Sequence, residues 1–315
     1  MTTVLVLRDG VHGMPVSAYA DELRARLPDA RIRVAETPAE ERELVADAEV
    51  VTGKLIDEDL LDRAEALRLF ACSYAGYGHL PLDALAERDV AVTTASGVHG
   101  PNIAEHVVGA ILAFVRRFPE GWRRQQRREW RHYRAHELAG STVTVVGLGA
   151  IGSAVVERLS GFGVHTIGVR HSPEKGGPTD EVLGTDDLHR ALARTDYLVL
   201  AVPLTDETEG LIDAKAFDTL PPSAVLVNVA RGPVVDTDDL VDALRSNHIR
   251  GAALDVTDPE PLPPDHVLWT LENAFVTPHN SGHTPKYYER LADIVAENVE
   301  QLDAASPEFV NRVHL

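Results

Sequence analysis

The 315-residue chain contains a single cysteine, Cys72, and only four lysines among its 30 basic residues. One cysteine excludes an internal disulfide and a cysteine-based metal cluster, and nothing else in the sequence predicts a metal site. Apolar runs long enough to cross a bilayer are also missing. The first seven residues lack the basic region and apolar stretch of a signal peptide. We therefore expect a cytoplasmic protein that does not bind membranes.

Acidic residues outnumber basic ones over the whole chain. The formal net charge is −19, although 44% of the residues are hydrophobic and can supply a core. Affinity for the phosphate backbone comes from Lys and Arg, so nucleic acid is not expected as a main partner. The acidic, lysine-poor composition has two open explanations. One is adaptation to a high-salt interior, where ions screen self-repulsion, and the other is a GC-rich genome that favours Arg codons.

The first hundred residues alternate between apolar strand-like runs and acidic helix-like stretches. Such alternation predicts a parallel sheet with crossover helices. The predicted strands are Val4–Leu7, Arg31–Val34, Val50–Thr52, Leu67–Ser73 and Val90–Thr94.

A second alternating series runs from Thr142 to about Pro278. It follows a helix with one apolar face that opens at Pro101 and an arginine-rich stretch from Arg116 to Arg134. We expect this stretch to be a solvated helix, in which Glu120 and Glu129 pair some of the positive charge. Its predicted strands are Val143–Val146, Val164–Val169, Leu198–Val202, Val225–Val229, Ala252–Asp255 and Ala274–Thr277. A final amphipathic helix is expected to pack back on the first series. The fold class is therefore α/β with two domains, residues 1–98 plus 286–315 and residues 99–285.

A glycine-rich turn directly follows the first strand of the second series. Gly147, Gly149 and Gly152, with Ala150 and Ile151 between them, form the pattern GxGxxG at the start of a predicted helix. Gly147 suits a tight turn, Gly149 lets a pyrophosphate approach the backbone, and Gly152 allows close helix–strand packing. The helix N-terminus favours negative charge. This context predicts a dinucleotide-binding site.

The end of the next strand indicates which dinucleotide is bound. NAD enzymes commonly carry Asp or Glu there to bind the ribose 2′-hydroxyl. This chain has Arg170, His171 and Ser172 instead. A guanidinium and a hydroxyl suit a 2′-phosphate, so NADP(H) is favoured over NAD(H). The alternative is that Arg170 is a solvated loop residue and NAD is used without the acidic contact.

Three polar side chains follow strands of the second series and suit hydride transfer to a 2-keto acid. They are Arg231, Glu260 and His279. Arg231 provides a permanent cation for a carboxylate and a carbonyl oxygen. His279 can exchange a proton near neutral pH, and Glu260 would orient its ring and favour the protonated form. Each residue taken alone also has a purely structural explanation.

Five segments together resemble the D-isomer-specific 2-hydroxyacid dehydrogenase family. They are Gly147–Gly152, Pro203–Thr208, Val227–Asp236, Asp255–Pro261 and Thr277–Gly282. The resemblance implies two Rossmann- or flavodoxin-like domains with parallel sheets flanking an active-site cleft. It implies a catalytic group of Arg231, Glu260 and His279, and a homodimer built by the helix near residues 101–118. Cofactor contacts are implied for Pro203, Thr208, Val229, Ala230 and Asp255.

In the family, a glycine-rich loop of the first domain binds the substrate carboxylate through backbone N–H groups. The matching residues here are Tyr74, Ala75, Gly76 and Tyr77, so these are expected substrate contacts with Arg231 and His279. His79 departs from the acidic or amide residue often found at its position. These aromatic and imidazole groups indicate either a distinct pocket or simple packing of the loop.

The sequence therefore predicts a D-2-hydroxyacid dehydrogenase acting as a glyoxylate, hydroxypyruvate or general 2-keto acid reductase with NADP(H). Formate is not expected, because formate dehydrogenases of the family carry glutamine where this chain has Glu260. Because the sequence ends at Leu315, we do not expect the regulatory domain of many phosphoglycerate dehydrogenases. Two alternatives stay open: an NAD-dependent enzyme of D-lactate type, and a dinucleotide-sensing corepressor.

Overall fold

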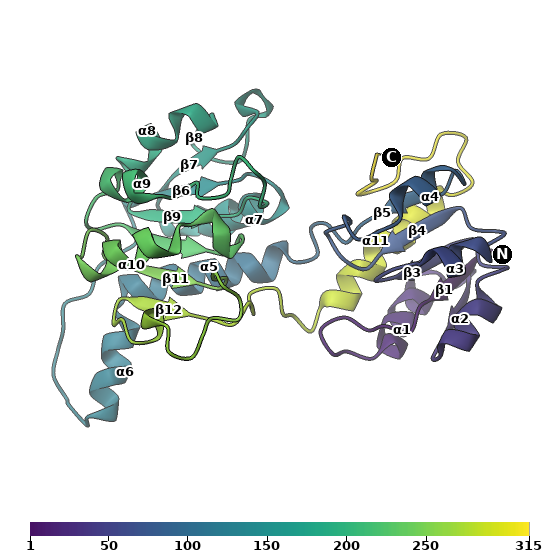
Figure 1. Cartoon of the computed structure of the whole chain (residues 1–315), viewed down its shortest axis with the longest axis horizontal. Coiled ribbons are helices and arrows are strands. Elements are labelled where there is room, and N and C mark those ends of the chain that lie inside the picture. The colour runs from purple at the N-terminus through teal and green to yellow at the C-terminus, as the bar shows by residue number, and fades with distance from the viewer. Residues whose placement is uncertain (315) are drawn as a thin grey trace. The chain divides into compact units, whose positions relative to one another are not determined.

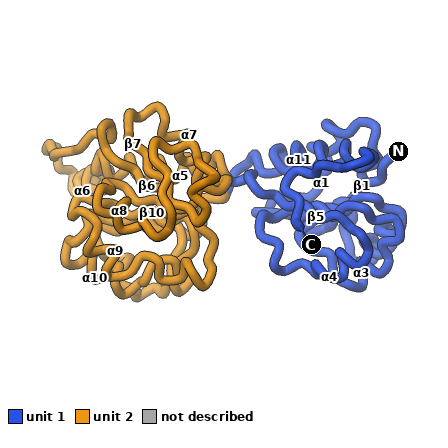
Figure 2. Tube along the Cα trace, turned by 90° about the horizontal axis from the view of Figure 1, so that it is seen from above, with its two compact units in different colours: residues 1–99, 283–315 blue, residues 100–282 orange. Residues whose placement is uncertain are grey.

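The computed structural model describes residues 1–314 and divides the chain into two compact units (Figure 2). The first unit comprises Met1–His99 and the segment from His283 onward, and the second comprises Gly100–Gly282. The chain thus leaves the first unit once and returns to it near its end. No described helix combines the length and the apolar character needed to span a membrane.

The first unit contains a five-stranded sheet in which every pair of neighbouring strands is parallel. The strand order β2-β1-β3-β4-β5 is the flavodoxin-like order. The strands β1, β3 and β4 are buried along their whole length, because helices cover both faces of such a sheet. The bounds are β1 Thr3–Val6, β2 Arg31–Val34, β3 Val50–Gly53, β4 Leu69–Cys72 and β5 Ala91–Thr93.

The closing helix α11 (Tyr287–Gln301) packs in the first unit against α1, as the sequence predicts. Its apolar face, including Leu291, Val295 and Val299, is buried with the strand residues of this sheet. Tyr287 is fully buried, and its hydroxyl donates a hydrogen bond to the carbonyl of Ser73. The other helices of this unit are α1 Val16–Arg26, α2 Pro38–Leu44, α3 Glu58–Asp62 and α4 Leu82–Ala86.

The second unit contains a seven-stranded parallel sheet of Rossmann type (Figure 1). Its order β12-β11-β10-β9-β6-β7-β8 extends the six-stranded Rossmann arrangement by one strand. The predicted α/β class with two parallel sheets is therefore confirmed. The bounds are β6 Thr142–Val146, β7 His165–Val169, β8 Glu181–Leu183, β9 Tyr197–Leu200, β10 Val225–Asn228, β11 Gly251–Leu254 and β12 Ala274–Val276.

The predicted apolar helix after Pro101 is α5 (Gly100–Val115). Ile103, Val107 and Ile111 are buried, and they pack with α7 and the central strands of the second sheet. The other helices of this unit are α6 Phe118–Gln126, α7 Ala150–Leu159, α8 Leu188–Leu192, α9 Ala214–Thr219 and α10 Thr237–Arg245. Short 3-10 turns lie at Ser160–Phe162, Pro173–Lys175, Thr185–Asp187, Gly232–Val234 and Val267–Trp269.

Two local predictions are wrong. The strand β8 was not expected, because three residues that begin with a charged Glu181 give no readable periodicity. The arginine-rich stretch was expected to be one solvated helix, but α6 ends at Gln126. Arg128 adopts a left-handed conformation with φ 57°, which stops the helix, and the following residues to Leu138 form no regular element.

Candidate active site

The loops that carry the predicted cofactor and catalytic residues of the second unit leave its sheet at the carboxyl ends of the strands. Asn228 of β10 pairs with Leu254 of β11, and Leu254 pairs with Val276 of β12. These three strands therefore end at the same level. The neighbouring pair β6 and β9 is where the strand order reverses, which is the usual ligand crevice of open α/β sheets.

The three glycines after β6 have distinct surroundings. Gly147 has φ +96°, and a Cβ there would meet the carbonyl oxygen of Ala201 at 2.5 Å. A Cβ on Gly152 would lie 1.8 Å from the carbonyl oxygen of Gly147, so helix α7 approaches the turn more closely than any side chain permits. Gly149, the N-cap residue of α7, faces open space. No side chain caps this helix, so its first N–H groups fit a phosphate.

The end of β7 places Arg170 beside a tight turn. Its Nη1 donates a hydrogen bond to the carbonyl of Gly176 at 2.7 Å, which holds the guanidinium near the turn that begins at Ser172. His171 is exposed, and its Nδ1 lies 3.8 Å from a carboxylate oxygen of Glu207. The loop after β9 is fixed by Thr208, whose hydroxyl donates to the carbonyl of Pro203 at 2.6 Å.

Arg231 follows a buried turn at the end of β10. Val229 and Ala230 are buried, and the side chain of Asn228 spans the turn by accepting from Ala230 N and donating to the Arg231 carbonyl. The exposed Arg231 donates from Nη1 to the Ala230 carbonyl at 2.6 Å. Within the described residues, Arg231 makes no ion pair or hydrogen bond with Glu260 or His279.

The carboxylate of Asp255 holds the loop that carries His279. Asp255 is only 2% exposed at the end of β11. It accepts hydrogen bonds from the backbone N–H of Asn280 and of Ser281, both at 2.9 Å, and from the Thr277 hydroxyl at 2.5 Å. The carbonyl of Asp255 also accepts the His279 N–H at 2.8 Å. His279 itself has φ 50°, a strained conformation for a non-glycine residue, and these bonds on either side fix it.

The carboxyl group of Asp255 stays ionised although it is buried. Burial alone raises the pKa of a carboxyl, but hydrogen bonds from Ser281, Thr277 and the backbone of Ser281 and Asn280 outweigh it. The pKa of Asp255 is therefore lowered from its ordinary value of 3.8. The group is a carboxylate throughout the physiological range.

Glu260 and His279 form the pair that the sequence predicts. The Nδ1 atom of His279 lies 2.6 Å from Oε1 of Glu260, although the two residues are 19 positions apart. Both side chains are partly exposed, at 48% for His279 and 41% for Glu260. The carboxylate binds one ring nitrogen and fixes the plane of the imidazole, which leaves Nε2 for exchange of a proton with a ligand.

The predicted substrate loop lies in the first unit, after β4. Tyr77 is 44% exposed, whereas Tyr74 is half-buried with the ammonium of Lys54 5.4 Å from its ring centroid. His79 shares a hydrogen bond of 2.8 Å with the Lys54 carbonyl. Ala75 and Gly76 are exposed at the tip of the loop. Tyr74 and His79 thus make contacts within the loop region, and Tyr77 extends into solvent.

Two polar residues near these sites were not singled out in the sequence. Lys54 directly follows β3, and β3 pairs with β4, which precedes the predicted substrate loop. The sequence could have indicated Lys54, because it follows a predicted strand that neighbours this loop. His106 of α5 lies on the same helix as the buried Ile103 and gives no signal on its own. Its Nε2 lies 3.5 Å from the Thr277 hydroxyl and 3.9 Å from Asp255 Oδ1.

Sequence comparison identifies the family. Residues 108–281 match the family described as D-isomer specific 2-hydroxyacid dehydrogenase, NAD binding domain. The chain belongs to the D-isomer specific 2-hydroxyacid dehydrogenase family. Membership supports a nicotinamide-dinucleotide-dependent oxidoreductase that acts on a 2-hydroxy acid or the corresponding 2-keto acid.

Three proteins to which this chain is similar illustrate the range of similarity. Glyoxylate reductase of Thermofilum pendens is 37% identical over 78% of this chain and 74% of its own. D-3-phosphoglycerate dehydrogenase of Methanocaldococcus jannaschii is 31% identical over 91% of this chain, which spans 56% of that protein. The crystal structure of a D-isomer specific 2-hydroxyacid dehydrogenase from Xanthobacter autotrophicus Py2, in complex with NADPH and MES, is 29% identical. It has a TM-score of 0.80, with 100% of this chain and 98% of that chain covered.

We predict that Asp255→Asn lowers the free energy of unfolding by about 1–3 kcal/mol, since an amide presents a donor to N–H groups that need an acceptor. Urea denaturation at neutral pH measures the loss. Because the folded-state pKa is lowered, the carboxylate contributes stability above the ordinary pKa of 3.8 and loses it as the pH falls through the folded value. The difference between the two proteins should therefore shrink only in that acidic range.

The exposed Asp265→Asn serves as the matched control, with no change expected. Equal stability of Asp255→Asn and the natural protein at neutral pH would show that Asp255 does not hold the loop.

Proposed function

We propose that this protein is a reductase of small 2-keto acids, such as glyoxylate or hydroxypyruvate, that takes its hydride from NADPH. The observation that carries the proposal is the 2.6 Å contact between Glu260 and His279 beside a buried, charged Asp255. A carboxylate-oriented imidazole at the carboxyl edge of a dinucleotide-binding sheet is the arrangement that reversible proton transfer to a carbonyl oxygen needs.

Each side chain has a distinct role in the proposal. The nicotinamide, when bound, supplies or accepts the hydride. His279 gives a proton from Nε2 to the substrate oxygen in reduction and takes it back in oxidation, while Glu260 stabilises the protonated ring. Arg231 binds the substrate carboxylate and polarises the carbonyl. Backbone N–H groups of residues 74–77 are the proposed second carboxylate contact, contributed by the first unit as its substrate domain.

The cofactor contacts follow from the second unit. Gly147–Gly152 and the N-terminus of α7 would hold the pyrophosphate, and the loops at Pro203–Thr208 and Val229–Ala230 would line the rest of the dinucleotide. The 2′-phosphate is assigned to Arg170, His171 and Ser172. No carboxylate occupies the residues directly after β7, which supports NADP(H), and the NADPH complex of the Xanthobacter relative is in keeping with it.

Two alternatives use the same residues. An NAD-dependent oxidation of D-lactate type requires the same Arg231, Glu260 and His279, and a solved relative at 22% identity is a D-lactate dehydrogenase from Treponema pallidum. That identity supports the fold alone. A dinucleotide-sensing corepressor would not need the Glu260–His279 pair, so the observed contact favours an enzyme.

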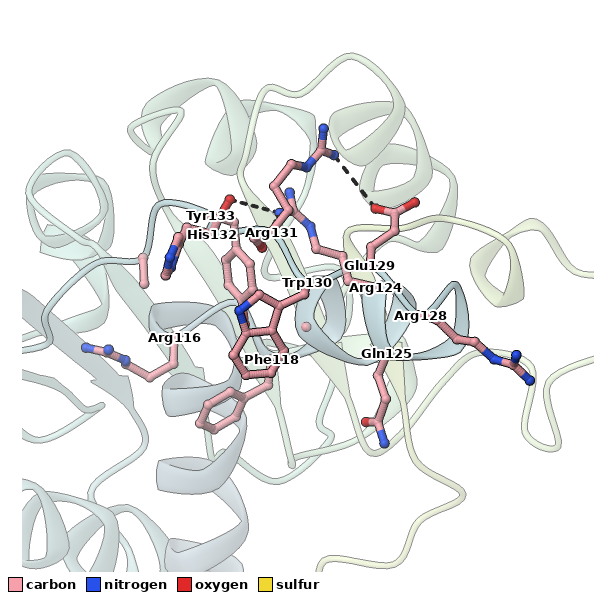
Figure 3. A pocket seen from close by; sticks show the side chains of 12 residues that line it. Arg116, Phe118, Arg124, Gln125, Arg128, Glu129, Trp130, Arg131, His132 and Tyr133 are labelled. Atoms are coloured by element: carbon pink, nitrogen blue, oxygen red, sulfur yellow. Dashed lines mark hydrogen bonds and ion pairs between the residues drawn. The ribbon is translucent and has the colours of Figure 1, made fainter.

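A homodimer is also part of the proposal, built by the helix near residues 101–118, with the segment 116–135 beside it as a further contact surface. Trp130 is fully exposed, and Trp122 and Phe118 are 54% and 46% exposed. Figure 3 shows Phe118, Trp130 and Tyr133 along a cavity of about 660 Å³, with Arg116 and Arg128 extending from it. Exposed aromatic groups of this size mark contact surfaces. Eight arginines against two glutamates between residues 116 and 134 complement a second copy of a chain whose net charge is −19.

We predict that His279→Ala lowers kcat for 2-keto acid reduction about 10²–10⁴-fold, because general acid catalysis is lost. Dinucleotide binding should stay nearly unchanged. The assay follows NADPH and NADH oxidation with glyoxylate, hydroxypyruvate, pyruvate and longer 2-keto acids, at low and at molar salt.

His248→Ala, a surface histidine of the same unit that lies 3.4 Å from Asp218, is the control and should retain full turnover. Undiminished turnover of His279→Ala would rule out the assigned role. No turnover of the natural, dinucleotide-binding protein at any salt would instead support the corepressor alternative.

We predict that Arg170→Asp raises KM for NADPH about 10–100-fold, as expected for loss of charge-assisted hydrogen bonds to a phosphate. KM for NADH should change little. Steady-state kinetics with both cofactors gives the ratio, and the exposed Lys215→Asp makes the same change of charge elsewhere in the unit. Equal losses with the two cofactors would contradict the assignment of Arg170 to the 2′-phosphate.

We predict that Trp130→Ser weakens self-association at least about 30-fold, the effect of losing an aromatic interface anchor. Sedimentation velocity over a concentration series measures it. Trp269→Ser, which removes another half-exposed tryptophan of the same unit, should leave association unchanged. A natural protein that is monomeric at micromolar concentration would disprove the proposed dimer.

A further inference from the structure

The candidate catalytic histidine lies in a short segment, residues 277–281, at the end of the second unit. This segment follows β12, the edge strand of the seven-stranded sheet, so β11 is its single neighbour among the described strands. The chain leaves the unit directly afterwards, at Gly282. Asp255 at the end of β11 holds the segment from the sheet. Support from one side matters for catalysis, because a misplacement of about 1 Å can cost roughly 100-fold in rate.

The first turn of α5 provides a second support. Nδ2 of Asn102 donates a hydrogen bond to the carbonyl of Ser281 at 2.7 Å, although the two residues are 179 positions apart. Ser281 is 6% exposed, and a buried carbonyl requires such a donor. Asn102 is the third residue of α5, and Ser281 is next to the last residue of the unit. The bond therefore joins the segments in which the chain enters and leaves the second unit.

His106, one turn further along α5, reaches the other end of the segment. Residues four apart lie on the same face of a helix, so Asn102 and His106 share a face. The Thr277 hydroxyl gives its proton to the Asp255 carboxylate, which can only accept. The hydroxyl oxygen can then accept a long hydrogen bond of 3.5 Å from Nε2 of His106. The imidazole acts on Asp255 through Thr277, because the direct distance of 3.9 Å is too long for a hydrogen bond.

The two contacts enclose His279. Thr277 and Ser281 each lie two residues from it, and both are bonded to Asp255 and to α5. His279 has a φ of 50°, a strained conformation that persists only where the surroundings fix it. Its side chain also keeps the 2.6 Å contact with Glu260. The bonds to α5 limit movement of the segment about its bonds to Asp255.

We propose that Asn102 and His106 are positioning residues for the reaction. They hold both ends of segment 277–281, so that Nε2 of His279 lies where it exchanges a proton with the substrate oxygen. They act through the segment and do not touch the reacting atoms. Asn102 contributes more than His106, because its hydrogen bond is shorter. This inference rests on the proposed function and adds to it the helix that aligns the proton donor.

The first test is Asn102→Asp. The two side chains have nearly the same shape, but a carboxylate cannot donate to the Ser281 carbonyl. Negative charge in the first turn of a helix is stabilising, so the variant is expected to fold. We expect kcat for 2-keto acid reduction to fall about tenfold or more, while KM for the 2-keto acid and dinucleotide binding change less than about threefold.

A pair of variants tests the second contact. His106→Gln keeps an N–H donor on a side chain of similar reach, whereas His106→Leu removes the donor. We expect His106→Leu to lower kcat about threefold, and His106→Gln to keep it within about twofold of the natural protein.

Two further measurements distinguish positioning from a loss of folded protein. Proton transfer from a displaced His279 becomes slower relative to the other steps, so the solvent deuterium isotope effect on kcat should increase in Asn102→Asp. A protein that is only less stable loses kcat in proportion to its folded fraction, and its isotope effect stays the same. Hydrogen exchange of the Asn280 and Ser281 amides, which are bonded to Asp255, should also be faster in Asn102→Asp.

The matched control is Glu105→Gln, on the same helix, with an exposed side chain that lies 3.5 Å from Arg158. It should retain the natural kcat, isotope effect and amide exchange. Natural kcat in Asn102→Asp would overturn the positioning role, as would a lower kcat with unchanged isotope effect and exchange. Absence of turnover in the natural protein would contradict the proposed function. Amide exchange then still tests the contact, and equal exchange in Asn102→Asp and the natural protein would overturn it.

Discussion

One buried negative charge sets the geometry of the candidate active site. Asp255 gives both carboxylate oxygens to backbone N–H groups of the segment that follows β12. A buried carboxylate without donors is costly, so the loop and the charge stabilise each other. These hydrogen bonds hold His279 in a left-handed backbone conformation, in which its side chain contacts Glu260 of a different loop. Without the Asp255 carboxylate, these hydrogen bonds would be lost, and the backbone of His279 would no longer be held beside Glu260.

Charge is distributed very unevenly along this acidic chain. Eight arginines lie between residues 116 and 134, whereas acidic residues outnumber basic ones over the whole protein. Guanidinium groups suit such a surface, since they form paired hydrogen bonds and pack on aromatic rings while remaining charged. The contacts of Arg124 with Tyr133 and of Arg250 with Tyr197 show this behaviour. Arginine therefore packs on an aromatic ring both in the exposed segment and on the buried Tyr197.

Patterns that depend on near neighbours were readable from the sequence. The alternation of apolar runs predicted the two parallel sheets, and the apolar face after Pro101 predicted α5. The GxGxxG turn was recognisable because two of its glycines meet local constraints, the positive φ of Gly147 and the close approach of the Gly147 carbonyl to Gly152. The family motifs also indicated Arg231, Glu260 and His279. Where the local signal is weak, the sequence-based prediction was wrong: it missed the three residues of β8 and the early end of α6.

The sequence by itself thus determined the fold class, the dinucleotide-binding turn and the identity of the candidate catalytic side chains. Only the tertiary structure decided how those side chains are held. The hydrogen bonds of Asp255 with Thr277 and Ser281, and the contact of His106 with Thr277, join residues that are distant in the chain. Such contacts leave no periodic trace, because they depend on which strands become neighbours and on where their ends meet.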